Sequence, residues 1–426
     1  MTTFPKAPGV YIDEVDELSF SISSATTAVP VFAISQTKNH PWWETIQQPL
    51  RIPSFSEFAS YVLGAVNAQP QSALSLQPNM RSLGGVRHWP GLASLAKTDG
   101  AGAFGNEAEW SRPLAPALRA YFDNGGGYCY LCPYDQLADA VPQMDDVTLI
   151  VQAGEPAAAA VIQQICTPGS MLFGLLDGPK EGTLEEAYPE MTPSDCAAIY
   201  YPWLKADWHI CGRDGSLIDK QNIHLVAPSA VVAGLMCKTD RQRGVWKAPA
   251  NISISAGLIP TVKIGDKTQA LYTSPNKSTL SVNMIRSFPG RGTQVWGART
   301  MSASGNSWSY IPVRRTFDMV ERDIGRVLES VLFESNGLAL WGKLRSTIDN
   351  YLFNLWQKGA FFGATPDKGY SIDVGAGVTM TQAEIENGIL KVRIGLAVVR
   401  PAEYVILEFT QQVANDNCDE SVASTA

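Results

Sequence analysis

The sequence holds few of the residues from which active sites and membrane spans are built. Charged residues make up 17% of the 426 positions, and only four residues are histidines. His40, His88, His209 and His224 share no H-x-x-x-H spacing, which would place two of them on one helix face for a metal. No run of about 18 apolar residues is present, and the first residues lack the charged and apolar regions of a signal peptide. We therefore expect no bound metal, no cofactor and no direct membrane insertion.

An excess of basic residues is also missing. The formal net charge is −8, whereas a protein that wraps nucleic acid normally presents a basic stripe, so we expect no nucleic acid contact. No segment repeats at a period of 20–50 residues, which argues against a solenoid. The chain is instead rich in glycine (36) and proline (27). This composition fits a protein that covers much of its surface with neighbours, but it also fits any loop-rich domain.

Seven cysteines without a signal peptide indicate free thiols from a reducing compartment. Cys129 and Cys132 form a C-x-x-C pair, but a zinc site needs two further ligands at suitable spacing. Four further cysteines are scattered singly: Cys166, Cys196, Cys211 and Cys237. The pair lies in a strand-like run, and strand residues three apart point to opposite faces, so we interpret both cysteines as structural. A G-x-G-x-x-G match at residues 100–105 lacks a strand before it and a helix after it, which indicates a loop.

Strand and helix patterns alternate up to about residue 280 and predict an α/β layer. Strands are predicted over residues 28–34, 148–151, 171–176, 261–264 and 271–272, and helices over 114–122 and 157–166. Ser54 and Glu57 have the spacing of a capping box at a helix start. Residues 64–113 are rich in Gln, Ser, Pro and Gly.

The last hundred residues carry the strongest periodic signals. Apolar residues recur at helical spacing from Asp318 to Val331, and again from Leu340 to Lys358, with a break at 335–337 between them. Residues 388–395 alternate at period two, which predicts a strand with one buried face. Pro401 cannot donate to a strand ladder, so the strand-like run 404–409 is expected to leave the domain body.

This order of motifs resembles the contractile tail sheath family, which includes phage tail sheaths, R-type pyocin sheaths and the sheaths of extracellular contractile injection systems. The motifs that carry the resemblance cover most of the chain in the right order. They are residues 7–14, 124–126, 200–203, 227–229, 239–241, 244–251, 295–300, 308–315, 340–341 and 399–404.

The resemblance implies an α+β (mixed α/β) fold in several domains, with extended N- and C-terminal strand arms. Residues 1–25 would form the N-terminal arm, 26–63 and 114–280 a middle α/β domain, 281–402 an inner C-terminal domain, and 403–426 a C-terminal strand arm and tail. Residues 64–113, where the chain departs from the family's pattern, would be an insertion displayed on the outer surface. Hexameric rings of a homo-oligomer would stack helically around an inner tube, between a baseplate and a terminator or cap. The particle would assemble in the bacterial cytoplasm and belong to a virion tail or a released extracellular injection particle.

The resemblance also implies which residues join the subunits. Strands of neighbouring copies would exchange by adding backbone hydrogen bonds at an open sheet edge. The residues expected to take part are Val10, Tyr11, Ile12, Val15, Leu390, Val392, Ile394, Tyr404, Ile406 and Phe409. On the second C-terminal helix, polar residues away from the apolar stripe are expected to meet the inner tube, the alternative being a merely solvated face. They are Lys343, Arg345, Asp349, Asn350 and Lys358.

Two other functions remain open from the sequence. A tail-tube or capsid subunit could exchange arms in the same way without contracting, although tube proteins are usually shorter and lack the two C-terminal helices. The third hypothesis is a redox enzyme that uses Cys129 and Cys132, but the absence of any other catalytic pattern leads us to expect no enzymatic activity.

Overall fold

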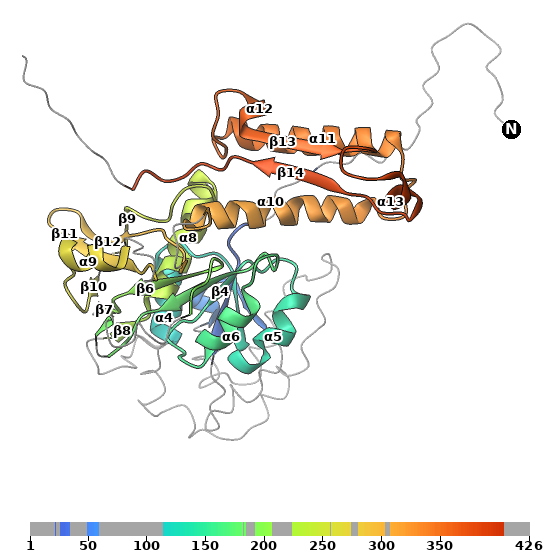
Figure 1. Cartoon of the computed structure of the whole chain (residues 1–426). Coiled ribbons are helices and arrows are strands. Elements are labelled where there is room, and N and C mark those ends of the chain that lie inside the picture. The colour runs from blue at the N-terminus through green and yellow to red at the C-terminus, as the bar shows by residue number, and fades with distance from the viewer. Residues whose placement is uncertain are drawn as a thin grey trace, which may run out of the picture.

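The structure is a computed structural model of the whole chain (Figure 1). It describes residues 22, 26–34, 49–58, 114–181, 183–184, 192–206, 224–255, 257–273, 280–302 and 307–403. The expected N-terminal arm strand, the insertion at 64–113, the glycine-rich run at 100–105 and the strand at 404–409 lie outside these residues.

A nine-stranded mixed sheet forms the centre of the α/β part, in the order β2-β3-β1-β4-β5-β6-β11-β12-β9. The strands from β3 to β11 along this order are parallel, whereas β2, β12 and β9 pair antiparallel to their neighbours. The nine strands are β1 Pro30–Ile34, β2 Leu50–Ile52, β3 Cys129–Pro133, β4 Leu149–Val151, β5 Phe173–Asp177, β6 Ala197–Tyr201, β9 Ile252–Ser253, β11 Asn283–Phe288 and β12 Gly292–Trp296.

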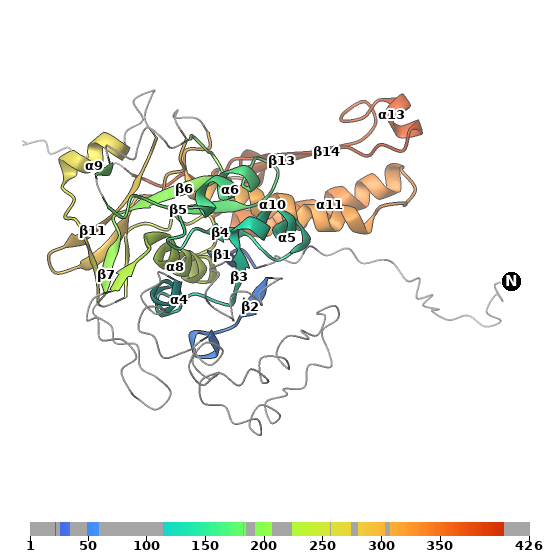
Figure 2. The same ribbon diagram turned by 90° about the horizontal axis from the view of Figure 1, so that it is seen from below.

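Helices cover both faces of this sheet, which explains why its parallel strands are continuous apolar runs (Figure 2). Every residue of β1 is buried, with Phe32 and Ile34 in the core on one face and Val31 and Ala33 in the core on the other. The helices α4 (Leu114–Asp123) and α8 (Pro228–Arg243) contribute to the first core, and α5 (Leu137–Ala140) and α6 (Ala158–Ile165) to the second. The predicted strands and helices of this region are thereby confirmed, with shifts of one to two residues at their ends.

A close contact joins the two helices on the first face. A Cβ built on Gly234 of α8 would lie 2.3 Å from the carbonyl oxygen of Tyr121 on α4, so any larger residue would push the helices apart. The predicted cap at Ser54 is also present, since the backbone N–H of Glu57 donates to Ser54 Oγ at 3.2 Å.

A smaller sheet, β10-β7-β8, and the helix α9 lie next to β11 of the central sheet. The bounds are β7 Leu204–Ala206, β8 His224–Val226, β10 Leu258–Pro260 and α9 Asp266–Thr273. The prediction of strands at 261–264 and 271–272 was wrong: the first segment has no regular structure, and the second lies in α9. Two adjacent apolar residues carry no period, and here Tyr272 is buried in the core while Leu271 is 63% exposed.

The C-terminal part begins with two long antiparallel helices, α10 (Ile311–Ser330) and α11 (Leu338–Gln357). The α10 helix starts seven residues before the predicted Asp318, because its first turns contain proline and charged residues rather than an apolar period. The predicted end of α11 is confirmed, with Lys358 as C-cap and Gly359 at a φ of 83°. None of the helices within the described ranges is long and apolar enough to cross a membrane.

Two strands pack against this pair of helices, which we call the helix hairpin. They are β13 (Tyr370–Val374) and β14 (Val392–Leu396), and the short helices α12 (Pro366–Gly369) and α13 (Gln382–Glu386) accompany them. In Figure 1, α10 lies between the α/β part and the layer formed by α11, β13 and β14. The expected boundary at residue 281 needs correction, because β11 and β12 are paired into the central sheet through β6.

Candidate assembly interface

The strand β14 is the described part of the expected strand-exchange site. It pairs antiparallel with β13 alone among the described strands, from Tyr370 opposite Leu396 to Val374 opposite Val392. Val392, Ile394 and Leu396 pack against the core of the helix hairpin, whereas Arg393 and Gly395 are exposed. The predicted alternation is therefore confirmed, and Leu390 lies just before the strand, packed against Val327, Val331 and Leu344.

The other expected exchange residues cannot be placed beside this strand. Val10, Tyr11, Ile12, Val15, Tyr404, Ile406 and Phe409 all lie outside the described residues, so their pairing stays a prediction.

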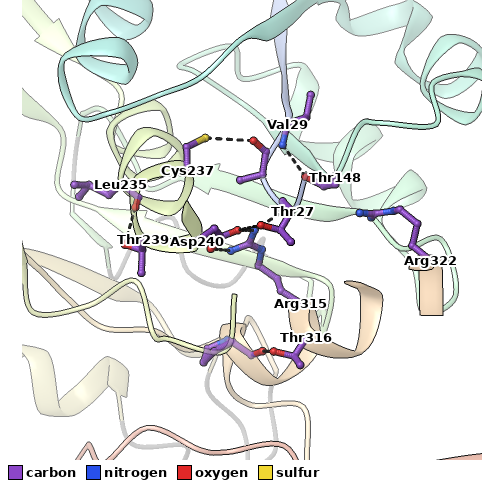
Figure 3. A network of polar contacts seen from close by, with 12 residues as sticks. Thr27, Val29, Thr148, Leu235, Cys237, Thr239, Asp240, Arg315, Thr316 and Arg322 are labelled. Carbon is purple, nitrogen blue, oxygen red and sulfur yellow. Dashed lines mark hydrogen bonds and ion pairs between the residues drawn. The ribbon is translucent and has the colours of Figure 1, made fainter. Parts of the chain in front are cut away.

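The chain that follows the N-terminal arm is held by a buried ion pair (Figure 3). Arg315 of α10 donates to the two carboxylate oxygens of Asp240 on α8, at 2.6 and 3.2 Å. The same guanidinium donates to the carbonyl oxygen of Thr27 at 2.9 Å, and the Thr27 hydroxyl donates to Asp240 at 2.7 Å. Both charged side chains are almost fully buried, with exposed fractions of 4% and 3%. Three separate segments of the chain are thereby joined where residues 26–29 enter the central sheet.

The chain that leads to the C-terminal arm is held in a similar way. The guanidinium of Arg299 donates to both carboxylate oxygens of Glu403, at distances from 2.6 to 3.0 Å. The Tyr310 hydroxyl donates to the same carboxylate at 3.1 Å, and Tyr310 is the N-cap residue of α10. Glu403 is the first residue of the segment expected to form the C-terminal arm and tail, 403–426.

Sequence reasoning did not assign these four charged residues a role. Arg299, Asp240, Arg315 and Glu403 each lie in one of the motifs that resemble the sheath family, and this membership was the only signal available. Their pairing is not readable from spacing, because the partners are 75 and 104 residues apart.

The face of α10 that meets the α/β part is charged along its length. Arg314 pairs with Asp318 one turn later at 2.5 Å, and burial raises the pKa of this carboxyl although the guanidinium opposes the shift. Further along, Arg322 donates to the carbonyl oxygen of Met171 at 2.6 Å, and Arg326 to that of Asp145 at 2.8 Å. The opposite face of α10 is apolar and packs against α11.

The expected tube-contact residues all lie exposed on α11 or directly after it. They are Lys343, Arg345, Asp349, Asn350 and Lys358. The apolar stripe that includes Trp341, Leu344 and Ile348 is buried, so the predicted division of the helix into two faces is confirmed. One of the five polar residues also has an internal role, because Asp349 accepts a hydrogen bond from the Tyr370 hydroxyl at 2.9 Å. Contact with a tube stays a prediction.

The cysteine pair has the properties of structural thiols. Cys129 and Cys132 lie on β3, and their side chains belong to the cores on opposite faces of the sheet. Burial raises the pKa of the Cys129 thiol well above its usual range and that of Cys132 to about 12, so both stay protonated near neutral pH. Within the described ranges, no three His, Cys, Asp or Glu side chains are grouped so that they could hold a metal ion.

Known sheath proteins resemble both the sequence and the structure. Residues 303–412 match the phage tail sheath C-terminal domain family. The tail sheath protein of Vibrio phage KVP40 is 27% identical over 137 residues, which are 31% of this chain and 19% of the relative. The tail sheath protein of Enterobacteria phage T4 is 26% identical over 124 residues, which are 29% of this chain and 18% of the relative. The match thus spans less than a fifth of the length of each phage protein.

Solved structures extend the likeness to nearly the whole chain. The sheath complex of an extracellular contractile injection system, PVC, in its contracted state has a TM-score of 0.74 and 38% identity, covering 97% of this chain and 99% of that one. The helical sheath of the anti-feeding prophage (AFP) in its contracted state has a TM-score of 0.66 and 31% identity, covering 96% and 100%. On this evidence the chain belongs to the contractile sheath protein family.

Proposed function

We propose that this chain is the subunit of a contractile sheath, which polymerises as stacked hexameric rings around an inner tube and contracts to drive that tube through a target envelope. The observation that carries the proposal is the likeness over nearly the full length to the PVC sheath complex, at 38% identity. Further structural matches come from AFP baseplate complexes, which supports a sheath that ends on a baseplate. A terminator or cap would close the other end.

Strand exchange would hold the copies together. The edge of β14 that does not face β13 is open among the described residues, and an open edge presents backbone N–H and C=O groups to another chain. Residues 10–15 of one neighbour and 404–409 of another would add to this edge beside Leu390, Val392 and Ile394. Such backbone links do not depend on how the domain bodies are oriented, so they could persist while the bodies rotate.

The work of contraction would come from the difference in interface free energy between an extended and a contracted lattice. A subunit trapped in the extended lattice would be metastable, and a trigger at the baseplate would release it. The buried ion pair between Arg315 of α10 and Asp240 of α8 supports movement of each subunit as a unit, because breaking such a pair is costly.

Electron microscopy of the protein, produced with and without its tube protein, tests this proposal. We expect wide hollow cylinders that enclose the tube when it is present and that shorten and widen after mild denaturant. Narrow tubes would support the tail-tube hypothesis, closed shells the capsid hypothesis, and dispersed monomers would contradict assembly of any kind.

A further inference from the structure

Ile22 of the N-terminal arm and Glu403 of the C-terminal arm contact opposite ends of the helix hairpin. Ile22 packs against Val327, Val331 and Leu344, at the end of α10 and the beginning of α11. Glu403 instead contacts Tyr310 at the beginning of α10. These two ends are separated by the 20 residues of α10, which corresponds to about 30 Å of helix.

Three large apolar side chains are exposed at the end where α10 turns into α11. We call Leu332, Phe333 and Leu338 the tip; their exposed fractions are 64%, 106% and 82%. Figure 2 shows that the turn between α10 and α11 projects beyond the α/β part, so the body does not cover the tip. Apolar groups gathered on a projecting turn are typical of an interaction site.

The turn that carries the tip is firmly built. Asn336 donates to the carbonyl oxygen of Ile389 at 3.0 Å, and the Trp341 indole donates to Asn336 Oδ1 at 2.8 Å. Phe333 has a φ of 71°, in the left-handed region that is unfavourable for a residue with a side chain. An unfavourable backbone conformation persists only where its surroundings fix it, so the point from which the exposed phenyl ring projects is well defined.

The opposite end of the hairpin carries an exposed aromatic residue of its own. We call the surface around Phe362 the heel; the Phe362 side chain is 75% exposed. This segment is also fixed, because the N–H of Phe362 donates to the carbonyl oxygen of Ala397 at 2.6 Å and the N–H of Val399 donates to that of Ala360 at 3.2 Å. Phe353, near the end of α11, is a further exposed ring, at 36%.

The exposed charges at the two ends have opposite signs. Beside the tip lie two exposed acids, Glu329 and Glu334, while the two bases at this end have partners within the chain: Arg326 donates to the Asp145 carbonyl of the body, and Lys391 pairs with Glu384. Beside the heel lie three exposed bases and one acid: Lys358, Lys368, Arg400 and Asp367. An apolar surface with an acidic rim at one end thus matches an aromatic surface with a basic rim at the other.

We infer that the tip of one subunit docks on the heel of a second copy of this chain. Such a contact joins two different surfaces, so it repeats head to tail and closes into a ring or continues as a helix. The inference rests on the proposed sheath function and adds to the strand links a direct contact between hairpins. The position of Ile22 supports the choice of partner, because this residue lies at the tip end and belongs to the arm that is expected to reach a neighbouring copy.

Single substitutions at the two surfaces test the contact. Phe333→Glu and Phe362→Glu should each lower the yield of cylinders about tenfold, the factor that corresponds to 1.4 kcal/mol per contact. Melting temperatures should stay close to that of the unchanged chain, since both side chains are largely exposed. Leu271→Glu, at a residue of α9 that is 63% exposed, is the matched control and should assemble normally.

A combined variant tests whether tip and heel meet each other. Phe333→Glu with Phe362→Lys replaces an apolar contact by an ion pair that follows the existing charges, and should assemble better than either Phe333→Glu or Phe362→Lys. Normal cylinders from both Glu variants, or no gain in the combined variant, would overturn the inference. So would a Phe333→Glu protein that polymerises alone but no longer encloses tubes, because the tip would then meet the tube. If the unchanged chain forms no cylinders, the proposed function itself has failed.

Discussion

Arg315 and Asp240 form a bidentate ion pair between α10 and α8, with nitrogen–oxygen distances of 2.6 and 3.2 Å. Both side chains have almost no exposure to solvent. The Thr27 carbonyl and hydroxyl complete the group, so a charged contact and not an apolar one fixes the entry of the chain into the sheet. Removing one member would leave the other charge in a site that water does not reach.

We therefore predict that Arg315→Met destabilises the subunit by about 3–5 kcal/mol, the range found when one partner of a buried pair is removed. The midpoint of denaturant unfolding measures this. The matched control is Arg119→Met, because Arg119 pairs with Asp123 at the surface, and we expect a loss of about 1 kcal/mol or less there. Equal losses in both variants would show that burial of the Arg315 pair has no special role.

The pair of Arg299 and Glu403 should affect assembly more than folding. Glu403→Gln keeps the size of the side chain but removes the charge opposite Arg299, at a cost of about 1–3 kcal/mol. The direction in which residue 404 leaves the body would be less well fixed, so we expect shorter sheaths in electron micrographs and a small change in melting temperature. Glu386→Gln makes the same change at an exposed position and should have no effect. Sheaths of normal length from Glu403→Gln would contradict the prediction.

Asp177 gives the protein a predictable dependence on pH. Its carboxylate accepts hydrogen bonds from the N–H and hydroxyl of Ser229, at 2.7 and 2.9 Å, and from the N–H of Gly154 at 2.9 Å. Burial outweighs these contacts and raises the pKa of Asp177 to about 6. The folded chain therefore holds this proton up to a higher pH than the unfolded chain, whose pKa is about 3.9. The contribution to stability is present below about pH 4 and is lost as the pH rises towards 6.

Asp177→Asn cannot ionise, so it should lack this part of the pH dependence. We expect the free energy of unfolding of the variant, relative to the unchanged chain, to rise by as much as about 3 kcal/mol between pH 4 and pH 7. Urea unfolding at both pH values measures the difference, with Asp367→Asn as an exposed control. The prediction would be contradicted if the difference in the free energy of unfolding between the two proteins were the same at both pH values. It would also be contradicted if the rise in pH favoured the unchanged chain over the variant.

The apolar periodicity of the sequence correctly predicted the strands and helices that are held in place mainly by apolar packing. The strand β1 and the helix α11 were predicted well because buried runs and a clear stripe mark them. The beginning of α10 was missed because Arg314 and Arg315 hold its first turns through ion pairs, which leave no apolar period. The helix α9 was mistaken for a strand because only Tyr272 among its residues is buried.

The candidate interface was predictable only in part. The alternation in β14 and the two faces of α11 follow from local spacing. The contacts at the arm bases join residues 75 and 104 positions apart, and the tip depends on which apolar residues remain uncovered after folding. Neither property exists until the chain has folded, so no local pattern could show it.

Deletion of residues 1–20 should separate folding from assembly. The deletion leaves Ile22 and Thr27 in place, so the contacts of these residues with α10 remain and the melting temperature should change little. Long sheaths should no longer form, because the strand expected at 10–15 would be missing. Size-exclusion chromatography and electron microscopy would measure both effects, and cylinders of normal length would contradict a linking role for the arm.

The polar face of α11 should grip the inner tube through individually weak charge pairs. Lys343 and Arg345 are exposed on either side of Leu344, which is fully buried, so both can change without disturbing the core. We expect the combined change Lys343→Glu and Arg345→Glu to impair sheath assembly on tubes and to leave the melting temperature nearly unchanged. Exposed pairs are screened by salt, so assembly of the unchanged protein on tubes should also weaken as ionic strength rises.

The control for this prediction is the combined change Lys263→Glu and Lys267→Glu, which alters the net charge equally at two exposed positions near α9. Co-sedimentation of each variant with preformed tubes gives the fraction bound. A sheath must hold the tube during assembly and release it on contraction, and several weak charge pairs allow this better than one large apolar patch. If the Lys343 and Arg345 variant binds tubes as the control does, these residues only face solvent, and the exposed residues Asp367 and Lys368 of α12 become the next ones to change.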